Sequence, residues 1–248
     1  MKHNKIKNKT NFIHGFNALK TTLTNKPFLI EKVYLADSRN DSKIQEIKTK
    51  LLKEKIKFVI ISNQEISNII QNDKHQGFLA SISWSILKKE NELKTDLQDL
   101  KNSKVLILDS IQDPRNLGAC LRSALAFGVD AVILNRDGTA PINEYTFKAS
   151  VGAVLGLDIY EVTNLSRSIE ALKKIDYWVI GLDGYSDQII SSDNLPNKIA
   201  IVLGSEGSGI RKLVKRNCDH LFKIPIAREV ESLNISVAAG IALYEFSK

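Results

Sequence analysis

Cysteine and long apolar segments are both scarce in this 248-residue chain. Its two cysteines, Cys120 and Cys218, form no Cys-x-x-Cys pair, and its four histidines lack the spacing of zinc ligands. This composition excludes a disulfide-stabilised scaffold and fits a reducing compartment, so we expect a cytoplasmic protein without a metal site. No apolar run reaches the roughly 18 residues of a membrane span, and no signal-peptide segment follows the basic start. We therefore expect no membrane partner.

Several nucleotide-binding and hydrolase motifs are also missing. The glycine-rich stretch at 204–209 reads Gly-x-x-Gly-x-Gly, which differs from the dinucleotide fingerprint, and no Gly-Lys-Ser/Thr follows it. The Gly-x-Ser-x-Gly elbow of α/β hydrolases does not occur. These absences disfavour a nicotinamide-dependent oxidoreductase, a P-loop enzyme and a hydrolase of that type.

Positive charge is concentrated in the first part of the chain. Residues 1–102 contain 19 Lys and Arg against 11 Asp and Glu, whereas residues 103–248 contain 16 against 17. The whole-chain charge of +7 therefore comes from the first part. This distribution suggests a polyanionic partner such as RNA, because Lys and Arg that neutralise phosphates release counterions. A lysine-rich composition inherited from an AT-rich genome is the alternative explanation.

The pattern of apolar segments divides the chain into a basic tail, a small α/β domain, a polar linker and a larger α/β domain. These parts span residues 1–11, 12–84, 85–102 and 103–248, respectively. In the small domain we expect strands at 32–35, 58–61 and 78–83, and helices at 14–23, 42–54 and 64–70. Ser42 is the predicted N-cap of the second of these helices.

The larger domain alternates apolar strands with helical patterns, which predicts a mainly parallel sheet covered by helices on both faces. The expected strands are 105–108, 131–134, 158–162, 178–182, 199–203 and 220–224. The expected helices are 117–127, 144–151, 166–174, 210–216 and 235–246. Ligands of such sheets bind beyond the carboxyl ends of the strands. A functional site is therefore expected in the loops after residues 108, 203 and 224.

Each of these loops has a structural and a functional interpretation. In the first, Asn116 is a predicted N-cap and Arg122 lies close behind it. In the second, Glu206 stands among three glycines, where a carboxylate can bind a cation or a hydroxyl group. In the third, Ser232 or Asn234 is the predicted N-cap of the last helix, whose first amides are free donors. Capping and ligand binding are compatible.

Taken together, the segments DPRNLGACLR, IVLGSEGSGI and IPI…ESLNISVAAGI resemble the three motifs of the SpoU (TrmH-type) RNA ribose 2′-O-methyltransferases of the SPOUT superfamily. Each segment alone is weak evidence for this family, but the occurrence of all three in this order is specific for it. The resemblance covers residues 103–248. A looser resemblance covers the small domain, residues 12–84, whose segments HGFNAL and HQGFLASIS are similar to the family's L30e-like RNA substrate-binding domain. The arrangement is most similar to members that methylate a guanosine of 23S ribosomal RNA.

The resemblance implies an α/β domain with a trefoil knot, S-adenosylmethionine as cofactor, a homodimer and ribosomal RNA as partner. The residues that match the family's cofactor site are Gly204, Ile224 and Leu233. The residues that match its catalytic set are Asn116, Arg122, Glu206, Ser232 and Asn234. Arg228 is a departure, because related sequences often have glycine there.

In methyl transfer to a ribose 2′-oxygen, positioning and electrostatics are expected to dominate. Arg122 would stabilise negative charge on the oxygen or hold a phosphate. Its use as a general base is the alternative, which is disfavoured because a guanidinium stays protonated at neutral pH. The other four residues would orient Arg122 and the ribose.

Two other functions remain open from the sequence. The same reaction on a transfer RNA guanosine is one, and the presence of a separate N-terminal domain argues against it. A non-catalytic RNA-binding factor for ribosome assembly is the other, and the intact catalytic set argues against that.

Overall fold

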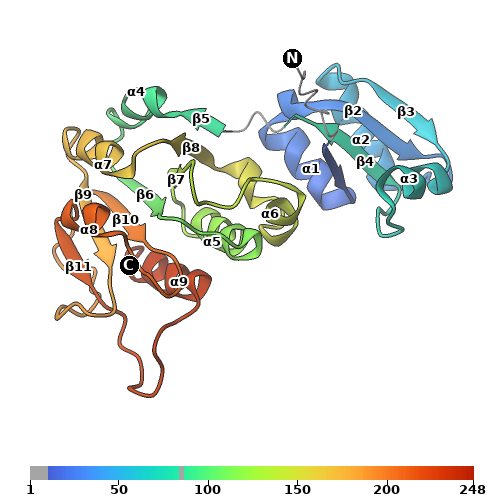
Figure 1. Cartoon of the computed structure of the whole chain (residues 1–248). Helices are drawn as coiled ribbons and strands as arrows, with labels where there is room; N and C mark the ends of the chain where they lie inside the picture. Colours follow the sequence, from blue (N-terminus) through green and yellow to red (C-terminus); the bar gives the residue numbers. More distant parts are fainter. Residues whose placement is uncertain (1–10, 84–86) are drawn as a thin grey trace, which may run out of the picture. The chain divides into compact units, whose positions relative to one another are not determined.

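The computed structural model describes residues 11–83 and 87–248, and the chain divides into two compact units at residues 86 and 87 (Figure 1). Unit 1 is the N-terminal unit and unit 2 the C-terminal one. Each is an α/β structure with its own sheet. No helix in the described part of the chain is both long and apolar enough to span a bilayer.

Unit 1 has a four-stranded sheet in the order β1-β4-β2-β3, in which only β2 and β3 run parallel. Its strands are β1 (Asn11–His14), β2 (Ile30–Ala36), β3 (Phe58–Ile61) and β4 (Phe78–Ile82). Its helices are α1 (Phe16–Asn25), α2 (Ser42–Lys53) and α3 (Asn63–Ile70), with the short turn η1 (Pro27–Leu29). Helix α2 forms because Ile44, Ile47 and Leu51 recur at helical spacing and are buried together.

Two local predictions for unit 1 are wrong. The helix expected from residue 14 begins at Phe16, because His14 pairs with Leu79 in the sheet and Gly15 breaks the strand with a φ of +88°. The N-cap of α2 is Asp41, whose carboxylate accepts from the amide of Ile44, and not Ser42.

Unit 2 has a seven-stranded, fully parallel sheet in the order β11-β9-β10-β6-β7-β8-β5, which confirms the predicted parallel α/β architecture. The strands are β5 (Leu87–Lys89), β6 (Ser103–Leu108), β7 (Ala131–Asn135), β8 (Asp158–Val162), β9 (Trp178–Leu182), β10 (Lys198–Leu203) and β11 (His220–Phe222). The central strands are buried on both faces, as their apolar runs predict.

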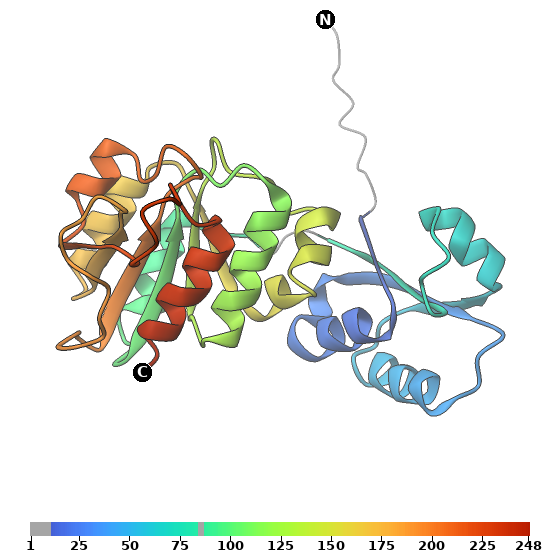
Figure 2. The same cartoon turned by 90° about the horizontal axis from the view of Figure 1, so that it is seen from below.

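Helices cover both faces of this sheet. One face carries α5 (Pro114–Ala126) and α9 (Ile235–Glu245), which lie side by side, and α6 (Glu144–Ala149) packs on α5 (Figure 2). The short turn η3 (Ala153–Gly156) also contacts α5. The other face is covered by α4 (Leu93–Leu97), α7 (Leu165–Lys173) and α8 (Lys212–Arg216), whose buried side chains share one apolar cluster with the strands.

The segment predicted as a linker, residues 85–102, is for the most part an ordered portion of unit 2. Residues 87–102 belong to unit 2, where β5 pairs with β8 and is followed by η2 (Glu90–Glu92) and α4. Leu93 and Leu97 are almost fully buried. Among charged neighbours such widely spaced leucines do not produce an apolar run, which is why the sequence pattern resembles a solvated linker.

The sheet has a topological switch point between β6 and β10. These strands are neighbours, yet the helix after β6 (α5) and the helix after β10 (α8) cover opposite faces. The segments after the two strands therefore start side by side at the carboxyl edge and lead to opposite faces, and ligands of open α/β sheets bind at such an edge. The trefoil threading of the last segments stays a prediction of the family resemblance.

Candidate active site

A cluster of three hydrogen-bonded polar side chains lies at this carboxyl edge. Asn116 Nδ2 donates to Glu206 Oε1 at 2.9 Å, and Asn234 Nδ2 donates to the same oxygen at 2.7 Å. Asn234 Nδ2 also lies 3.1 Å from Asn116 Oδ1, so the three side chains form a closed triangle. The structure thus brings together residues from all three predicted loops, separated by up to 118 positions in sequence.

Asn116 is available for this cluster because it does not cap its helix. The N-cap of α5 is Asp113, whose carboxylate accepts from the amide of Arg115 at 2.7 Å, and Pro114 occupies the first helical position. The prediction of Asn116 as N-cap is therefore wrong by one turn. Its side chain, placed within the first turn, projects toward Glu206 instead.

Asn234 has two functions at the start of α9. Its Oδ1 accepts from the amide of Ser236 at 2.9 Å and so caps the helix, while its Nδ2 belongs to the cluster. The amide of Ile235 adds a further hydrogen bond to Glu206 Oε1 at 3.3 Å. Of the two predicted caps, Asn234 is therefore the one used. Ser232 is exposed in the preceding loop and donates no hydrogen bond to a described residue.

The loop that carries Glu206 is closed tightly by glycines. A Cβ on Gly204 would lie 2.0 Å from the carbonyl carbon of Gly209, so only glycine permits this approach. Ser205 and Gly209 exchange backbone hydrogen bonds across the turn, and Gly207 and Gly209 have φ values of +84° and +65°. Between them, the amides of residues 206–208 donate to no described residue. The loop therefore presents free donors to a ligand.

A buried carboxylate that the sequence analysis missed secures the end of this loop. Asp109, directly after β6, is fully buried and accepts from the backbone amide of Arg211 at 3.0 Å and from its Nε at 2.7 Å. Ser110 Oγ donates to the same carboxylate at 3.1 Å. The sequence signal was available, since an acidic residue directly after an apolar parallel strand lies at the ligand-binding edge.

Arg122 lies away from the cluster in the structure. It is the ninth residue of α5, exposed, and its side chain makes no hydrogen bond or ion pair with a described residue. Six residues after Asn116, it stands about 9 Å further along the helix and on another side of it. A helix capped by Asn116 would have Arg122 in its second turn, but α5 begins at Pro114 and Arg122 lies in the third turn.

The residues expected to line a cofactor lie on three segments of the same edge. Gly204 follows β10 directly, Ile224 follows β11 by two residues, and Leu233 precedes the N-cap of α9. Between Ile224 and Leu233 the chain forms the long loop that projects before α9 in Figure 1, with Arg228 exposed in it. Among the amides of residues 224–233, only that of Val230 donates to a described backbone carbonyl.

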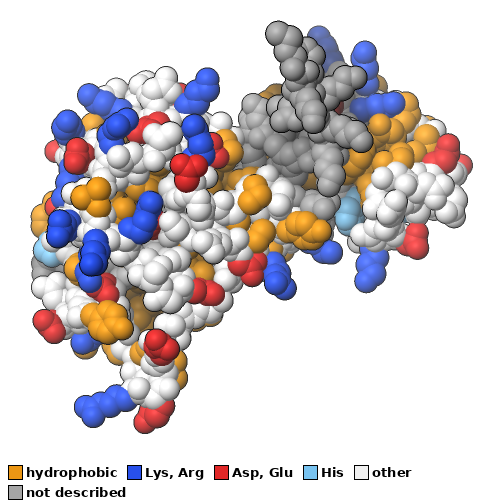
Figure 3. Space-filling view, in the orientation of Figure 1, with side chains coloured by type: hydrophobic (Ala, Val, Ile, Leu, Met, Phe, Trp, Pro, Cys, Tyr) orange, Lys and Arg blue, Asp and Glu red, His pale blue; other side chains and the backbone are white. Residues whose placement is uncertain are grey.

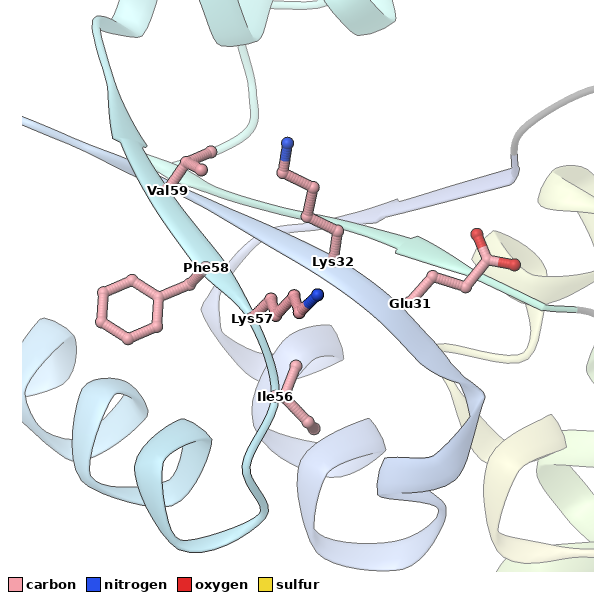
Figure 4. Close-up of a pocket in the computed structure, with 6 residues that line it drawn as sticks. All are labelled: Glu31, Lys32, Ile56, Lys57, Phe58 and Val59. Carbon is pink, nitrogen blue, oxygen red and sulfur yellow. The ribbon is translucent and has the colours of Figure 1, made fainter.

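Unit 1 carries a separate surface hollow of about 530 Å³ at the start of β2 and β3. It is lined by Glu31, Lys32, Ile56, Lys57, Phe58 and Val59 (Figure 4). In the close-up, the side chains of Lys32 and Val59 point to one side of the sheet, away from Ile56. None of the predicted site residues line this hollow.

A polar cluster and a glycine-rich loop at a switch point define unit 2 as an α/β ligand-binding domain. Residues 103–244 match the model of the SpoU rRNA methylase family, and residues 12–84 match the model described as RNA 2′-O ribose methyltransferase substrate binding. The chain belongs to the SpoU rRNA methylase family.

Curated relatives match nearly the whole chain. The 23S rRNA (guanosine-2′-O-)-methyltransferase RlmB of Coxiella burnetii is 40% identical over 237 residues, which are 95% of this chain and 94% of that protein. The enzyme of the same name from Yersinia pestis is 35% identical over 94% of this chain and 95% of its own length.

Solved structures share the fold at lower identity. The AdoMet-bound rRNA methyltransferase from Sinorhizobium meliloti superposes with a TM-score of 0.77 at 20% identity, covering 96% of this chain and 86% of that one. The SpoU methyltransferase AviRb from Streptomyces viridochromogenes gives 0.78 at 16% identity, covering 96% and 88%.

Proposed function

We propose that this protein is an S-adenosylmethionine-dependent 2′-O-methyltransferase that modifies a guanosine of 23S ribosomal RNA. The observation that carries the proposal is the triangle of Asn116, Glu206 and Asn234 beside the glycine-rich loop. The near full-length similarity to enzymes named for this reaction supports the choice of substrate. Such a substrate agrees with the cytoplasmic location expected from the cysteine content.

The donor groups at the carboxyl edge fit S-adenosylmethionine. The free amides of residues 206–208 and the largely unpaired backbone of residues 224–233 suit the ring nitrogens and the carboxylate of such a molecule. Gly204, Ile224 and Leu233 would hold it from these segments. When bound, it supplies a methyl group on a positively charged sulfur.

Glu206 holds the acceptor ribose in this proposal. Its Oε1 already accepts from Asn116, Asn234 and the amide of Ile235, so the carboxylate is fixed in orientation. Its Oε2 accepts from no described residue and is free for a ribose hydroxyl. Asn116 and Asn234 act by positioning Glu206, and Ser232 adds a hydroxyl from the adjoining loop.

Arg122 contributes positive charge. Because its guanidinium is exposed and unpaired within the described chain, it is free to pair with a phosphate or with negative charge that develops on the 2′-oxygen. Its distance from Asn116 along α5 requires the RNA, or a second subunit, to bridge the two positions.

A homodimer supplies that second subunit. Val237, Ile241 and Tyr244 recur along one face of α9 and are 49%, 37% and 58% exposed, although the opposite face of the helix is buried. Exposed apolar side chains at helical spacing favour a protein interface. Replacement of Ile241 by Glu should convert a dimer to a monomer in light scattering. A wild-type protein that is monomeric at micromolar concentration would contradict the proposal.

RNA binding by unit 1 completes the proposal. This unit matches the substrate-binding model, and the first 102 residues carry the excess of positive charge. Structured RNA is recognised largely through its shape and its backbone phosphates.

The proposed reaction is tested by methyl transfer. Ribosomal and transfer RNA from cells lacking this protein would be incubated with it and methyl-labelled S-adenosylmethionine, and the labelled nucleotide mapped. We expect label on the 2′-oxygen of one guanosine of 23S RNA. Label on transfer RNA would show that transfer RNA, and not 23S RNA, is the substrate. Binding of the cofactor without label on any RNA would favour a non-catalytic assembly factor.

Substitution of Arg122 tests its role in the same assay. Arg122→Ala should abolish turnover and leave the affinity for S-adenosylmethionine within a few-fold of wild type, while Arg122→Lys should retain part of the rate if charge is what matters. Arg115→Ala is the matched control, because Arg115 is exposed on the same helix and pairs only with Asp113 within the described chain. Normal turnover of Arg122→Ala would remove the role proposed for it.

A further inference from the structure

A short basic helix follows the glycine-rich loop directly. Four of the six residues from Arg211 to Arg216 are Lys or Arg, although unit 2 as a whole has almost no net charge. Val214 is buried in the apolar cluster beneath α8 and anchors the helix. The charged side chains consequently point outward, beside the loop that carries Glu206.

Intramolecular carboxylates use only part of this charge. Arg211 pairs with the buried Asp109, and Lys215 pairs with Asp183. Lys212 and Arg216 are exposed, and neither pairs with a carboxylate in the part of the chain that the structure describes. Two unpaired cations are therefore left on α8.

The charge continues onto the neighbouring helix. Arg167, in the first turn of α7, is also exposed, and its side chain makes no ion pair with a described residue. Helices α7 and α8 contact each other on the same face of the sheet. In the space-filling view, Lys and Arg side chains lie, with Asp and Glu among them, on the side of unit 2 where Figure 1 shows α7 and α8 (Figure 3).

An exposed aromatic ring lies beside these cations. Tyr185 is 93% exposed, and its amide donates to Asp183 Oδ1 at 3.2 Å, while the other oxygen of Asp183 pairs with Lys215 of α8. Ser186 fixes the turn further, because its Oγ donates to the carbonyl of Leu221 at 2.6 Å. The ring is therefore held in solvent by a fixed turn next to α8.

We propose that Lys212, Arg216 and Tyr185 form an RNA-binding surface on the catalytic unit, which contacts the strand flanking the target nucleotide. The proposal rests on the function proposed above and adds a substrate contact outside unit 1. Unpaired Lys and Arg side chains bind backbone phosphates, and an exposed aromatic ring stacks on an unpaired base without regard to its identity. Arg211, fixed by Asp109, keeps this surface adjacent to the reacting ribose.

The phosphate contacts are tested with an unmodified transcript of 23S RNA. Binding would be measured at several salt concentrations for the wild type, for Lys212→Glu/Arg216→Glu, and for the control Lys94→Glu/Lys174→Glu. The control makes the same change in net charge on α4 and at the C-cap of α7, where both lysines are exposed. We expect the α8 variant to lose at least tenfold in affinity and to lower the salt slope by about 2, because two phosphate contacts disappear.

Kinetic constants separate a contact from a general loss of structure. In the α8 variant the KM for RNA should rise at least tenfold, with the affinity for S-adenosylmethionine and the melting temperature unchanged. Tyr185→Ala should weaken RNA binding about tenfold without a change in the salt slope, since stacking involves no phosphate. An unchanged affinity in Tyr185→Ala would exclude stacking.

The outcomes distinguish this inference from the proposed function. If the wild type methylates the transcript and the α8 variant keeps a wild-type KM and salt slope, the RNA-binding surface is refuted and the function stands. If the wild type neither binds nor methylates any RNA, both proposals fail.

Discussion

Gly204 offers the sharpest test of whether the geometry of the glycine-rich loop is needed for the proposed reaction. A Cβ at this position would lie 2.0 Å from the carbonyl carbon of Gly209, 2.1 Å from the nitrogen of Ile210 and 2.2 Å from the carbonyl oxygen of Gly209. Non-bonded carbons approach to about 3.5 Å, so Gly204→Ala must move the loop by more than about 1 Å. Since all three contacts are backbone atoms, no side-chain rotation relieves the overlap.

The displaced loop carries Glu206 and the free amides, so its movement should reduce catalysis more than stability. A misplacement of about 1 Å can cost about 100-fold in rate, which corresponds to about 2.7 kcal/mol. Overpacking costs about 1–3 kcal/mol of folding free energy, and each kcal/mol lowers the melting temperature by about 2–4 °C in a protein of this size. We therefore expect kcat/KM to fall about 100-fold in a protein that still folds.

The assay compares Gly204→Ala with Gly184→Ala. Gly184 lies in the turn beside Tyr185, where an added Cβ meets no atom within 4 Å, so it is the control for folding and for cofactor binding. Binding of S-adenosylmethionine by calorimetry and thermal unfolding would be measured for both variants, and the rate of methyl transfer for Gly204→Ala and wild type. A kcat/KM within threefold of wild type in Gly204→Ala would refute the argument that the loop geometry is needed.

Two further predictions follow from titratable groups. Hydrogen bonds from Lys88 and Tyr160 lower the pKa of Asp96 in the folded protein. The ionised Asp96 therefore stabilises the fold at any pH above its pKa in the unfolded chain, which is about 3.9. This stabilisation is lost as the pH falls through the lower pKa of the folded state. Chemical denaturation at pH 7 and pH 3 should therefore show a smaller loss of stability in Asp96→Asn than in wild type; equal losses would contradict this. Burial raises the pKa of the Cys120 and Cys218 thiols to about 12, so neither should react with iodoacetamide at pH 8 in the folded protein, whereas both should react in denaturant. Rapid labelling of the native protein, read by mass spectrometry, would show the thiols to be accessible.

The larger sheet was predictable because its strands are buried on both faces. Six apolar segments such as 131–134 and 199–203 became strands close to the predicted positions. The seventh strand, β5, was not predictable, because it is a short edge strand with two lysines and no apolar run, and it is recognised only by its pairing with β8. Local pattern identifies a buried strand more readily than an edge strand.

The candidate site also has residues that the sequence identifies and residues that it does not. The rule that ligands bind beyond the carboxyl ends of parallel strands selected the loops of Asn116, Glu206 and Asn234 before any contact between them was known. The rule also applies to Asp109, directly after β6, but this residue was not singled out. The choice of Asn116 as N-cap placed Arg122 too close to the start of its helix. A helix start depends on which of several capping residues is used, and here Asp113 caps α5.

The sequence by itself determined the class of fold, the family and the edge of the sheet where the candidate site is expected, because apolar periodicity and short motifs are local properties of the chain. Only the tertiary structure decided that the Asn116–Glu206–Asn234 triangle closes and that Asp109 fixes Arg211. It also decided that Lys212 and Arg216 pair with no carboxylate among the described residues. The hydrogen bonds of the triangle join residues that are 28 to 118 positions apart in the chain. Whether a surface cation is paired depends on which carboxylates lie near it in the folded protein. Such contacts form because the parallel pairing of β6 with β10 places the loops that follow these strands at the same edge of the sheet.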